Sequence, residues 1–462
     1  MDNWRSRIME SPRHYEYLFL GGGKGGKSLA MDLARSGKRV AVIERGMIGG
    51  SCINVACIPS KTLIQNARNM HAWRTAAAPA RPVADMARVH ANVRGVVEGM
   101  VDINRRAFEQ SGLELVIGSG RFVAPRRIAV RAADGSEQVF EGENVYINTG
   151  TVATIPDVPG LRDAGPLTHV EALDLDVLPE KLIVIGGGYV GLEMAQAFRR
   201  LGSEVVVVHD APRVAAREDE DVSIAIQQAF ESDGITLKLS ARVARVDGRS
   251  GAGVTVALGD GTTVEGSHLL VATGRRPVTD GIGLELAGVE RDERGFIKVD
   301  DTLATTAERT WAIGEVAGTP MFTHASFDDY RVLKAGIEGR RGSTASRVIP
   351  YALFTDPELA RIGLNEAEAK ARNTPVIVAK LPMAAVPRAR TNGTTTGFMK
   401  ALVAPDTGRI LGFTMVGAGA GEVMSAVQIA MIGKLPYTSV RDAILAHPLL
   451  AEGLNLLFAT IK

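Results

Sequence analysis

Long hydrophobic runs, an excess of charge and cysteines are all scarce in this chain of 462 residues. No uninterrupted apolar run reaches the ~18 residues of a transmembrane helix. The 53 basic residues balance the 52 acidic ones, so the chain carries no electrostatic footprint for nucleic acid or a membrane surface. The opening stretch MDNWRSRIMESPRHYEY lacks the apolar core of a secretory signal. We therefore expect a cytoplasmic protein with a short extension before its first strand.

The two cysteines of the chain, Cys52 and Cys57, lie in one short motif. A secreted disulfide scaffold distributes its cysteines along the chain, whereas a cytosolic protein keeps thiols reduced unless they serve in chemistry. The Cys-x4-Cys spacing is not that of a zinc ribbon, and no further Cys or His cluster accompanies it, so we predict no metal site. The pair indicates either redox chemistry or two small buried residues that happen to be close.

Glycine, by contrast, is abundant, with 51 residues, and the run GGGKGGKS at 21–28 fits two incompatible motifs. In one, Gly21, Gly23 and Gly26 form the dinucleotide fingerprint, whose glycines let a pyrophosphate approach the start of a helix. In the other, the same run ending in Lys27 and Ser28 is a P-loop, which binds a nucleoside triphosphate with Mg²⁺.

An internal repeat favours the dinucleotide. The stretch KLIVIGGGYVGLEMAQAF repeats the fingerprint at Gly186, Gly188 and Gly191, again between an apolar strand and an amphipathic helix. We find no other apolar strand ending in the acid that a P-loop enzyme needs for Mg²⁺. Lys27 is therefore predicted to be a solvated surface lysine.

The two repeats differ where their second strands end, at Glu44 in the first and at His209 in the second. An acid at this place accepts hydrogen bonds from a ribose hydroxyl. It would also repel the extra phosphate of NADP. The histidine, followed by Arg213 and Arg217, therefore gives a slight lean to NADPH over NADH, although the arginines could instead face solvent or pair with Glu218 and Asp219.

A family resemblance rests on GGSCINVACIPSKT at 49–62, INTG at 147–150, VATGRRP at 271–277, WAIGEVAG at 311–318 and AHPLLAEGLNLLF at 446–458. These motifs resemble, in family order, those of the flavin-dependent pyridine nucleotide–disulfide oxidoreductases, such as dihydrolipoyl dehydrogenase, glutathione reductase and mercuric reductase. The resemblance covers nearly the whole chain after residue 15.

The resemblance implies an α/β fold with two Rossmann-like domains, one for FAD and one for NAD(P)H, and a C-terminal α+β dimerisation domain. The expected FAD domain is split into 1–155 and 272–345, around an NAD(P) domain at 156–271. The dimerisation domain is expected at 346–462. The stretch VGAGAGE at 416–422 imitates a third fingerprint, but no acid-ended strand follows it. We interpret it as a turn into an interface helix.

The resemblance also assigns catalytic roles. Cys52 and Cys57 would form the redox disulfide, with Cys57 as the thiolate against the flavin and Cys52 as the thiol that attacks substrate. The chain from about Lys61 is predicted to be helical, and a helix N-terminus favours thiolate. His447 and Glu452 would be an acid–base pair supplied by the partner subunit of a homodimer, because imidazole titrates near neutral pH and a carboxylate can orient it.

Lys61 and Glu193 match an ion pair beside the flavin, and Tyr189 matches an aromatic gate over the nicotinamide pocket. The positions that the resemblance assigns to cofactor binding are Gly21, Gly23, Gly26, Glu44, Ser51, Gly120, Thr149, Gly150, Glu315, Gly186, Gly188, Tyr189, Gly191, His209 and Gly274.

Three positions depart from the family pattern. Ala56 replaces a glycine before the second cysteine, and Leu449 replaces a threonine after His-Pro. Glu315 replaces an aspartate that binds the flavin side chain, and its extra methylene moves the carboxylate by over ~1 Å.

The substrate is less well indicated. The chain lacks the additional C-terminal cysteine pair of mercuric reductases. The retained HP…E motif favours a substrate whose reduction needs a proton, such as a disulfide or another oxidised sulfur compound. Stretches such as GGGKGGKSLA and VPRARTNGTTTGFMKA resemble bacterial flavoproteins of reactive-chlorine resistance and hypothiocyanous acid reduction. Arg388 and Arg390 could bind an anionic substrate or form interface ion pairs.

Three functions therefore stay open. The first is a reductase that uses NAD(P)H to reduce a small disulfide or sulfur oxidant. The second is a dihydrolipoyl dehydrogenase that oxidises dihydrolipoamide with NAD. The third is a redox-sensing flavoprotein whose thiols switch a partner.

Overall fold

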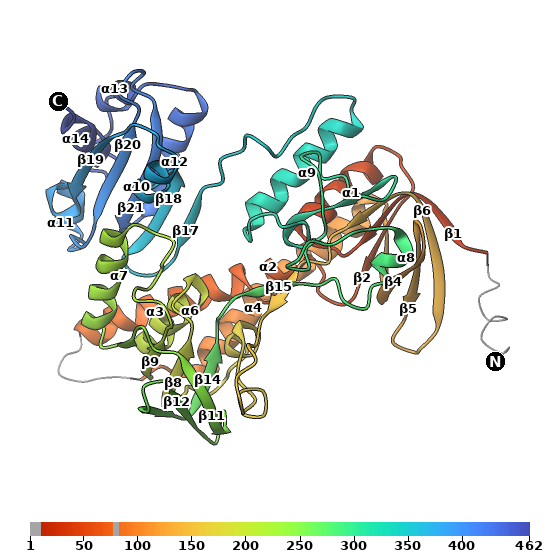
Figure 1. Cartoon of the computed structure of the whole chain (residues 1–462), viewed down its shortest axis with the longest axis horizontal. Coiled ribbons are helices and arrows are strands. Elements are labelled where there is room, and N and C mark those ends of the chain that lie inside the picture. The colour runs from red at the N-terminus through yellow and green to blue at the C-terminus, as the bar shows by residue number, and fades with distance from the viewer. Residues whose placement is uncertain (1–10, 77–82) are drawn as a thin grey trace. The chain divides into compact units, whose positions relative to one another are not determined.

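The computed structural model describes residues 11–76 and 83–462. These residues divide into two compact units (Figure 1). The first unit takes the chain up to Thr62 together with Ala91–Thr154 and Gly274–Arg347. The expected N-terminal extension falls largely on residues 1–10, which lie outside the described residues. The first strand begins at Arg13, earlier than the sequence suggested.

The first unit is built on a seven-stranded sheet in the order β3-β2-β1-β6-β5-β4, with β16 also paired to β6. Strands β3, β2, β1, β6 and β16 are parallel, whereas β4 and β5 form an antiparallel extension. The strands are β1 (Arg13–Leu20), β2 (Val40–Glu44), β3 (Glu114–Ile117), β4 (Ser119–Ala124), β5 (Arg127–Arg131), β6 (Glu137–Ile147) and β16 (Thr310–Ala312).

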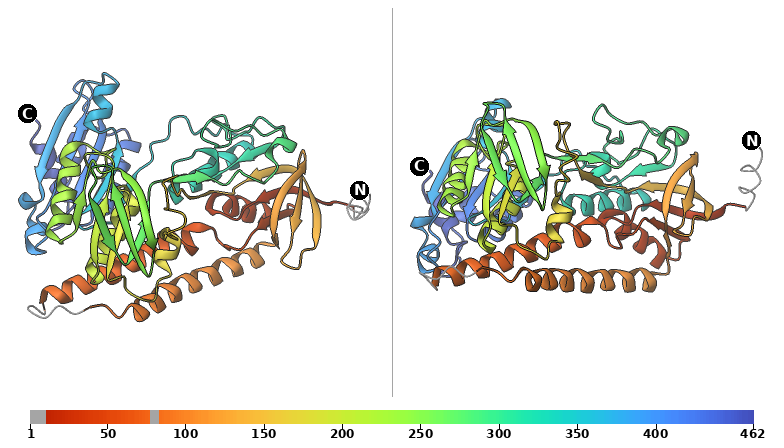
Figure 2. Two further views of the ribbon diagram at one scale, coloured as in Figure 1. Left: turned by 60° about the horizontal axis from the view of Figure 1, so that its bottom comes forward. Right: turned by 90° about the horizontal axis from the view of Figure 1, so that it is seen from below.

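Both faces of this sheet are buried, which explains the uninterrupted apolar runs of its parallel strands. Alternate residues of β1 enter separate cores: Phe19 packs with α1 and α9, while Leu18 and Leu20 pack with α8. Figure 1 shows α1 and α9 side by side, and Figure 2 shows α4 as one long helix. The helices and short strands that lie wholly or partly in this unit are α1 (Lys24–Arg35), α2 (Ser51–Asn54), α3 (Cys57–Ala76), α4 (Met86–Ser111), β7 (Thr151–Ala153), β15 (Arg275–Pro277), α8 (Leu284–Ala287), η2 (Gly314–Ala317) and α9 (Thr323–Ile337).

The second unit contains a parallel sheet in the order β10-β9-β8-β14 and an antiparallel meander of β11, β12 and β13. Helix α6 connects β8 to β9, which gives the second strand–turn–helix–strand unit predicted from the repeat. The elements are α5 (His169–Leu173), β8 (Lys181–Ile185), α6 (Tyr189–Leu201), β9 (Glu204–Val208), α7 (Glu220–Ser232), β10 (Thr236–Lys238), β11 (Val243–Arg249), β12 (Gly253–Leu258), β13 (Thr263–Gly266) and β14 (His268–Val271).

The same unit ends in a five-stranded antiparallel sheet ordered β17-β18-β21-β20-β19, on which α12 and α14 pack. Strand β21 passes through a short turn into α12, as predicted for the VGAGAGE stretch. The fold class predicted from the sequence is confirmed. The elements are β17 (Tyr351–Leu353), β18 (Glu358–Gly363), α10 (Glu366–Ala371), β19 (Ile377–Pro382), η3 (Met383–Ala385), α11 (Pro387–Thr391), β20 (Phe398–Val403), β21 (Ile410–Gly417), α12 (Ala420–Ile432), α13 (Tyr437–Arg441) and α14 (Gly453–Ala459).

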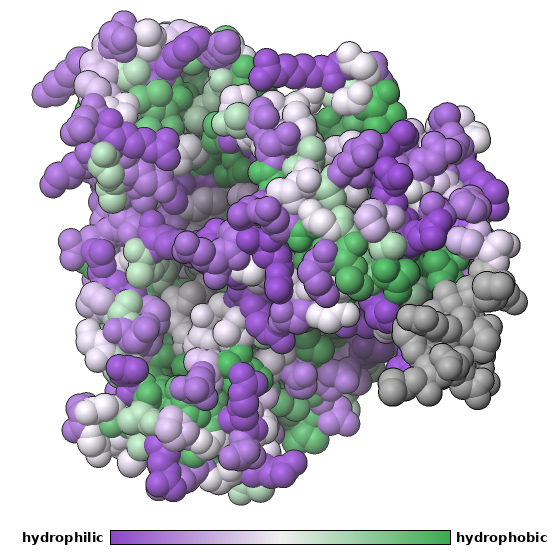
Figure 3. All heavy atoms as spheres, turned by 45° about the vertical axis from the view of Figure 1, so that its right-hand side comes forward, coloured by the Kyte–Doolittle hydropathy of each residue, from purple (hydrophilic) through white to green (hydrophobic). Residues whose placement is uncertain are grey.

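Within the described part of the chain, no helix combines the length and the apolarity that crossing a membrane requires. Figure 3 shows one face of the molecule, on which hydrophilic side chains prevail and hydrophobic ones form separate patches.

Candidate active site

The first glycine turn connects β1 to α1 and packs against Asn148 at the end of β6. A Cβ on Gly21 would lie 2.4 Å from the Asn148 backbone oxygen, and one on Gly23 or Gly26 would lie 2.6 or 2.7 Å from Asn148 Oδ1. Helix α1 begins at Lys24, and its N-cap Gly23 offers no side-chain hydrogen bond. Backbone N–H groups at such a helix start can bind a pyrophosphate, so the turn fits a dinucleotide.

Lys27 is not the surface residue that the sequence predicted. Only 4% of the Lys27 surface is exposed. Its ammonium group donates to the Gly49 carbonyl at 3.0 Å and to Asn104 Oδ1. Burial lowers the pKa of Lys27 to about 8. The Lys27 side chain is therefore bonded to the loop before Cys52. This arrangement does not support a P-loop.

Glu44 lies at the end of β2, beside the same turn. Its Oε2 accepts a hydrogen bond from Gly22 N at 2.8 Å, and its Oε1 accepts from Gly46 N and Met47 N at 2.9 Å each. A carboxylate has about four acceptor sites. Glu44 is thus fixed by the backbone while it keeps acceptor capacity for a ribose hydroxyl.

The second glycine turn repeats this construction. A Cβ on Gly186 would lie 2.4 Å from the Ala272 oxygen, and one on Gly191 would lie 2.0 Å from the Gly186 oxygen. A Cβ on Gly188, however, would meet no atom within 4 Å. The open space at Gly188, at the start of α6, is where a pyrophosphate can approach the backbone.

His209 occupies the place of Glu44 in this second unit, since a Cβ on Gly187 would lie 2.6 Å from its ring. Burial lowers the pKa of His209, whereas the charge of Asp210, 3.2 Å from its Nδ1, acts in the opposite direction. Of the two arginines that follow, Arg213 lies 3.5 Å from Glu220 and Arg217 is exposed. The suggested pairing of Arg213 with Glu218 or Asp219 is wrong, because those two acids bond elsewhere.

The two cysteines are free thiols, and both are half-buried. Cys57 is the first residue of α3, which begins before the predicted Lys61, so the helix dipole acts directly on its sulfur. Pro59 in the first turn is compatible with a helix start. Cys57 Sγ lies 3.5 Å from the hydroxyl of Thr323. This threonine, the first residue of α9, was not identified from the sequence.

Cys52 lies in α2, with its thiol in contact with Cys57. That contact and burial raise the pKa of Cys52, whereas a hydrogen bond with Thr323 and the charge of Lys27 act in the opposite direction. The structure therefore brings the two predicted thiols together and adds a hydroxyl and a cation to them.

Glu315, at the η2 turn, is paired within the first unit. Thr151 donates its hydroxyl to Glu315 Oε2, and Arg275 Nε lies 3.5 Å from the same oxygen. The buried Asp329 accepts from Gly314 N at 2.7 Å and so holds this turn. Sequence reasoning did not identify Arg275 or Asp329, because their partners lie far away along the chain.

Five other predicted cofactor positions shape the same unit. Thr149 donates its hydroxyl to the Val278 carbonyl at 2.8 Å. Gly150 and Gly274 have φ of 69° and 132°, a region that favours glycine. Gly120 packs against the strand core, since a Cβ there would lie 2.6 Å from Leu20 Cδ1. Ser51 is the first residue of α2.

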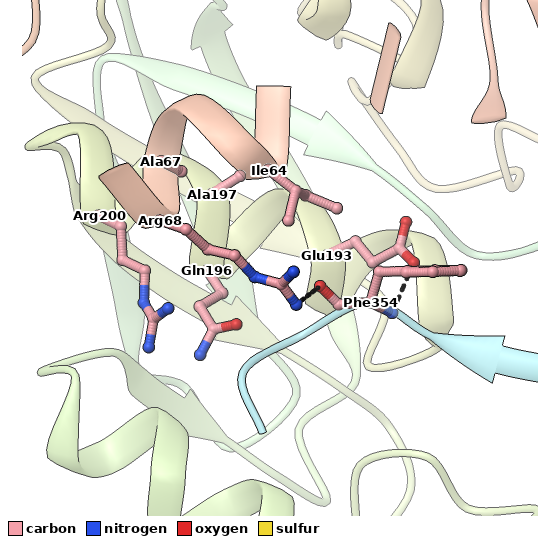
Figure 4. Close-up of a pocket in the computed structure, with 8 residues that line it drawn as sticks. All are labelled: Ile64, Ala67, Arg68, Glu193, Gln196, Ala197, Arg200 and Phe354. Atoms are coloured by element: carbon pink, nitrogen blue, oxygen red, sulfur yellow. Dashed lines mark hydrogen bonds between the residues drawn. The ribbon is translucent and has the colours of Figure 1, made fainter. Parts of the chain in front are cut away.

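Glu193 lies on α6, one turn after Tyr189, and is 7% exposed. Its Oε1 accepts a hydrogen bond from Phe354 N at 3.0 Å, as Figure 4 shows. Glu193 also lines a small pocket. The residues around this pocket are Ile64, Ala67, Arg68, Glu193, Gln196, Ala197, Arg200 and Phe354. Its predicted partner Lys61 lies on α3 in the first unit.

Tyr189, the first residue of α6, donates its hydroxyl to Glu218 Oε1 at 2.5 Å. Tyr351 donates to the same oxygen at 2.8 Å, and Arg361 Nε lies 3.1 Å from Glu218 Oε2. The Glu218 side chain is fully buried. The two tyrosines thus donate to one oxygen of Glu218, and the Arg361 charge lies beside the other. Sequence reasoning did not assign this carboxylate to the site.

His447 and Glu452 are paired as predicted. The imidazole Nδ1 lies 3.0 Å from Glu452 Oε2, and the His447 side chain is 67% exposed. A carboxylate at this distance orients the ring and leaves Nε2 towards solvent. Arg388 and Arg390 of α11 are exposed, and Arg390 Nε donates to the Ala384 carbonyl at 2.5 Å.

Two dinucleotide turns, a pair of adjacent thiols and an exposed histidine–carboxylate pair define a flavin-dependent disulfide oxidoreductase. Residues 15–329 match the family model described as pyridine nucleotide-disulphide oxidoreductase, and residues 349–457 match the dimerisation domain of this family.

Solved structures and curated proteins agree. The chain is 34% identical to the HOCl-induced flavoprotein disulfide reductase RclA from Escherichia coli, with a TM-score of 0.89 over 97% of this chain and 100% of that one. It is 33% identical to a mercuric reductase of Bacillus cereus, over 96% of this chain and 71% of that protein. It is also 33% identical to a dihydrolipoamide dehydrogenase of Chaetomium thermophilum, over 95% of this chain and 89% of that protein.

The chain therefore belongs to the pyridine nucleotide–disulfide oxidoreductase family. It is an NAD(P)H-dependent flavin disulfide oxidoreductase with a C-terminal dimerisation domain.

Proposed function

We propose that this enzyme uses NAD(P)H to reduce a small disulfide or another oxidised sulfur compound, and that it acts as a homodimer in the cytoplasm. The carrying observation is the contact between the Cys52 and Cys57 thiols beside Thr323, in a chain with no other cysteine. Thiols in the cytoplasm are kept reduced, so a lone adjacent pair is suited to reversible oxidation.

The turns fit the two cofactors. The residues that would hold FAD are Gly21, Gly23, Gly26, Glu44 and Glu315, in an FAD domain of residues 1–155 and 272–345. The second turn, at Gly186, Gly188 and Gly191, would hold NAD(P)H in residues 156–271, and the dimerisation domain would follow at 346–462. Bound flavin accepts a hydride from NAD(P)H and delivers two electrons to a disulfide.

The chain's own residues would then carry out the sulfur chemistry. Those two electrons would break the Cys52–Cys57 bond and leave two thiolates, one at Cys52 and one at Cys57. The Cys52 thiolate attacks one sulfur of a substrate disulfide, forms a mixed disulfide and displaces a thiolate, which receives a proton from His447. The Cys57 thiolate attacks Cys52 Sγ, which restores the Cys52–Cys57 bond and releases the second thiol of the substrate after protonation.

The partner subunit would supply His447 and Glu452. Large apolar side chains are exposed on the dimerisation domain, and exposed apolar patches mark association surfaces. Ile429 and Ile432 are each 68% exposed on α12, and Leu449 and Leu456 are exposed beside the His447 pair. A second copy of the chain would cover these side chains.

The slight preference for NADPH is inferred from the residue that follows β9. The residue at this position is His209, so no acid there repels a ribose phosphate. Arg217 is exposed on the following loop and can approach such a phosphate. Lys61 and Glu193 are proposed to lie beside the flavin, and Tyr189 beside the nicotinamide.

The first experiment adds NADH, and separately NADPH, to the oxidised enzyme without oxygen while the flavin spectrum is recorded. We expect a long-wavelength charge-transfer band from the Cys57 thiolate with the preferred coenzyme. In Cys52→Ser, which has no disulfide to receive electrons, the band should already be present before the coenzyme is added and should disappear when the flavin is reduced. Cys57→Ser should show no band at any stage. Full bleaching of the wild-type flavin without this band would show that the thiols accept no electrons, and the proposal would fail.

Turnover then separates the alternatives. Rapid NAD⁺ reduction by dihydrolipoamide would identify a dihydrolipoyl dehydrogenase. Intact thiol titration with no turnover of any disulfide or oxidised sulfur acceptor would identify a redox sensor.

A further inference from the structure

The two dinucleotide repeats differ at one buried position. The residue after Gly191 is Leu192, which is fully buried. The residue after Gly26 is Lys27, which is 4% exposed. The second repeat shows that this strand–turn–helix unit needs only an apolar side chain there. Burying an ammonium group is costly unless it is compensated, so the lysine requires a local explanation.

The hydrogen-bond partners of Lys27 are both neutral. Its Nζ donates to the Gly49 carbonyl at 3.0 Å and to Asn104 Oδ1 on α4. Asn104 is itself oriented, because its Nδ2 donates to the Met100 carbonyl at 2.8 Å. Among the described residues, the charged groups that act on Lys27 are Lys24, which repels it, and Cys52, which attracts it when ionised.

Gly49 opens the turn that carries Cys52. Gly49 and Gly50 have φ of 91° and 86°, and a Cβ on Gly50 would lie 2.9 Å from Gly23 Cα. The cysteine turn therefore packs directly on the first dinucleotide turn. The Lys27 hydrogen bond to Gly49 ties α1 to this turn at a second point.

Lys27 lies beside the turn that carries Cys52, because its Nζ donates to the carbonyl of Gly49, three residues before this cysteine. Burial and the neighbouring Cys57 disfavour ionisation of Cys52, whereas Thr323 and Lys27 favour it. Thr323 offers a neutral hydroxyl that also contacts Cys57. Lys27 is thus the cationic contribution to the thiol centre.

We propose that Lys27 is a positioning residue of the redox centre, whose ammonium group anchors the Gly49 turn and acts as counter-cation to the Cys52 thiolate. This inference rests on the proposed function, because Cys52 is a nucleophile only where the two cysteines form the redox pair.

The test measures alkylation of Cys52 in the reduced FAD-containing enzyme. In this reaction the thiolate sulfur displaces iodide from iodoacetamide, and mass spectrometry follows the product at Cys52. The variants are Lys27→Met, which removes the charge, Lys27→Gln, which keeps a hydrogen-bond donor, and Lys27→Arg, which keeps the charge. Lys24→Met is the matched control, because Lys24 lies in the same helical turn but packs over the Phe327 ring at 4.8 Å.

We expect Lys27→Met and Lys27→Gln to slow alkylation about tenfold, the change that a shift of about one unit in the thiol pKa produces. Lys27→Arg and Lys24→Met should stay within about threefold of wild type on the same scale. Rates for Met and Gln equal to wild type, with FAD bound, would overturn the inference. If the Met variant does not fold, the Gln and Arg variants decide alone.

The charge-transfer band separates this test from the proposed function. Absence of the band in the wild-type enzyme would refute the dithiol mechanism whatever the Lys27 variants do. A normal wild-type band with unchanged alkylation in the variants would refute the role of Lys27 alone.

Discussion

Tyr189 and Glu218 form a 2.5 Å hydrogen bond in which the phenol donates to a fully buried carboxylate. Tyr189 directly follows the second dinucleotide turn, whereas Tyr351, which shares Glu218 Oε1, comes from β17. Glu218 thus fixes the one tyrosine that would meet the nicotinamide.

Tyr189→Phe and Glu218→Gln should therefore each raise the KM for the preferred coenzyme about fivefold, equivalent to ~1 kcal/mol, the usual net value of one hydrogen bond. The double variant should lose less than the two single losses combined, because both substitutions act on the same contact. Tyr351→Phe is the control and should leave this KM near the wild-type value. Additive losses in steady-state kinetics would contradict the coupling.

Gly188 and Gly191 of the second turn should respond differently to alanine. A Cβ at Gly191 would lie 2.0 Å from the Gly186 oxygen, whereas one at Gly188 would meet no atom of the described residues within 4 Å. Gly188 also has an ordinary φ of −85°. We expect Gly188→Ala to fold normally, to keep FAD and to weaken coenzyme binding more than about tenfold, because the new methyl group occupies the approach of the pyrophosphate.

Gly191→Ala should lower the melting temperature as well, since the backbone itself must shift. Thermal unfolding and coenzyme titration of both variants measure these effects. A Gly188→Ala enzyme with unchanged coenzyme affinity would show that the pyrophosphate lies elsewhere.

His447→Ala should slow the disulfide half-reaction by about 10²-fold to 10⁴-fold, the usual contribution of a general acid or base. Flavin reduction by the coenzyme should be unchanged. Glu452→Gln should have a smaller effect on the same half-reaction, because the amide can still hold the ring 3.0 Å away. Stopped-flow measurement of both half-reactions decides, and equal losses in the two would contradict the assigned role.

Lys400 links three carboxylates from inside the second unit. Its fully buried Nζ lies 2.7 Å from Asp219 and from Glu366 and 2.9 Å from Asp221. Lys400→Met should reduce the free energy of unfolding by about 3–5 kcal/mol, because it removes a buried cation and leaves the buried Asp219 carboxylate without it.

Lys380, which is 45% exposed and 2.6 Å from Asp221, is the matched control. Lys380→Met should cost less than about 1 kcal/mol, as surface ion pairs do. Urea unfolding followed by circular dichroism compares the two variants. Similar losses of unfolding free energy in the two variants would mean that the carboxylates are already stabilised by other groups.

Much of the fold was predictable because its signals are local. An apolar strand, a glycine turn and an amphipathic helix are adjacent in the sequence, so both dinucleotide units could be recognised from 21–44 and 186–209. The family resemblance of the segment around Cys52 and Cys57 likewise assigned two thiols to one redox pair. The pairing of His447 with Glu452 was predicted from the same resemblance.

The sequence by itself therefore determined the fold class, the two cofactor turns and the thiol pair. Only the tertiary structure decided what surrounds them. Lys27 is buried because Gly49 and Asn104 close over it, and Glu218 is buried because Tyr189, Tyr351 and Arg361 converge on it. A charged side chain is stable in the interior only where distant partners meet it, and no local pattern records which distant residues those are.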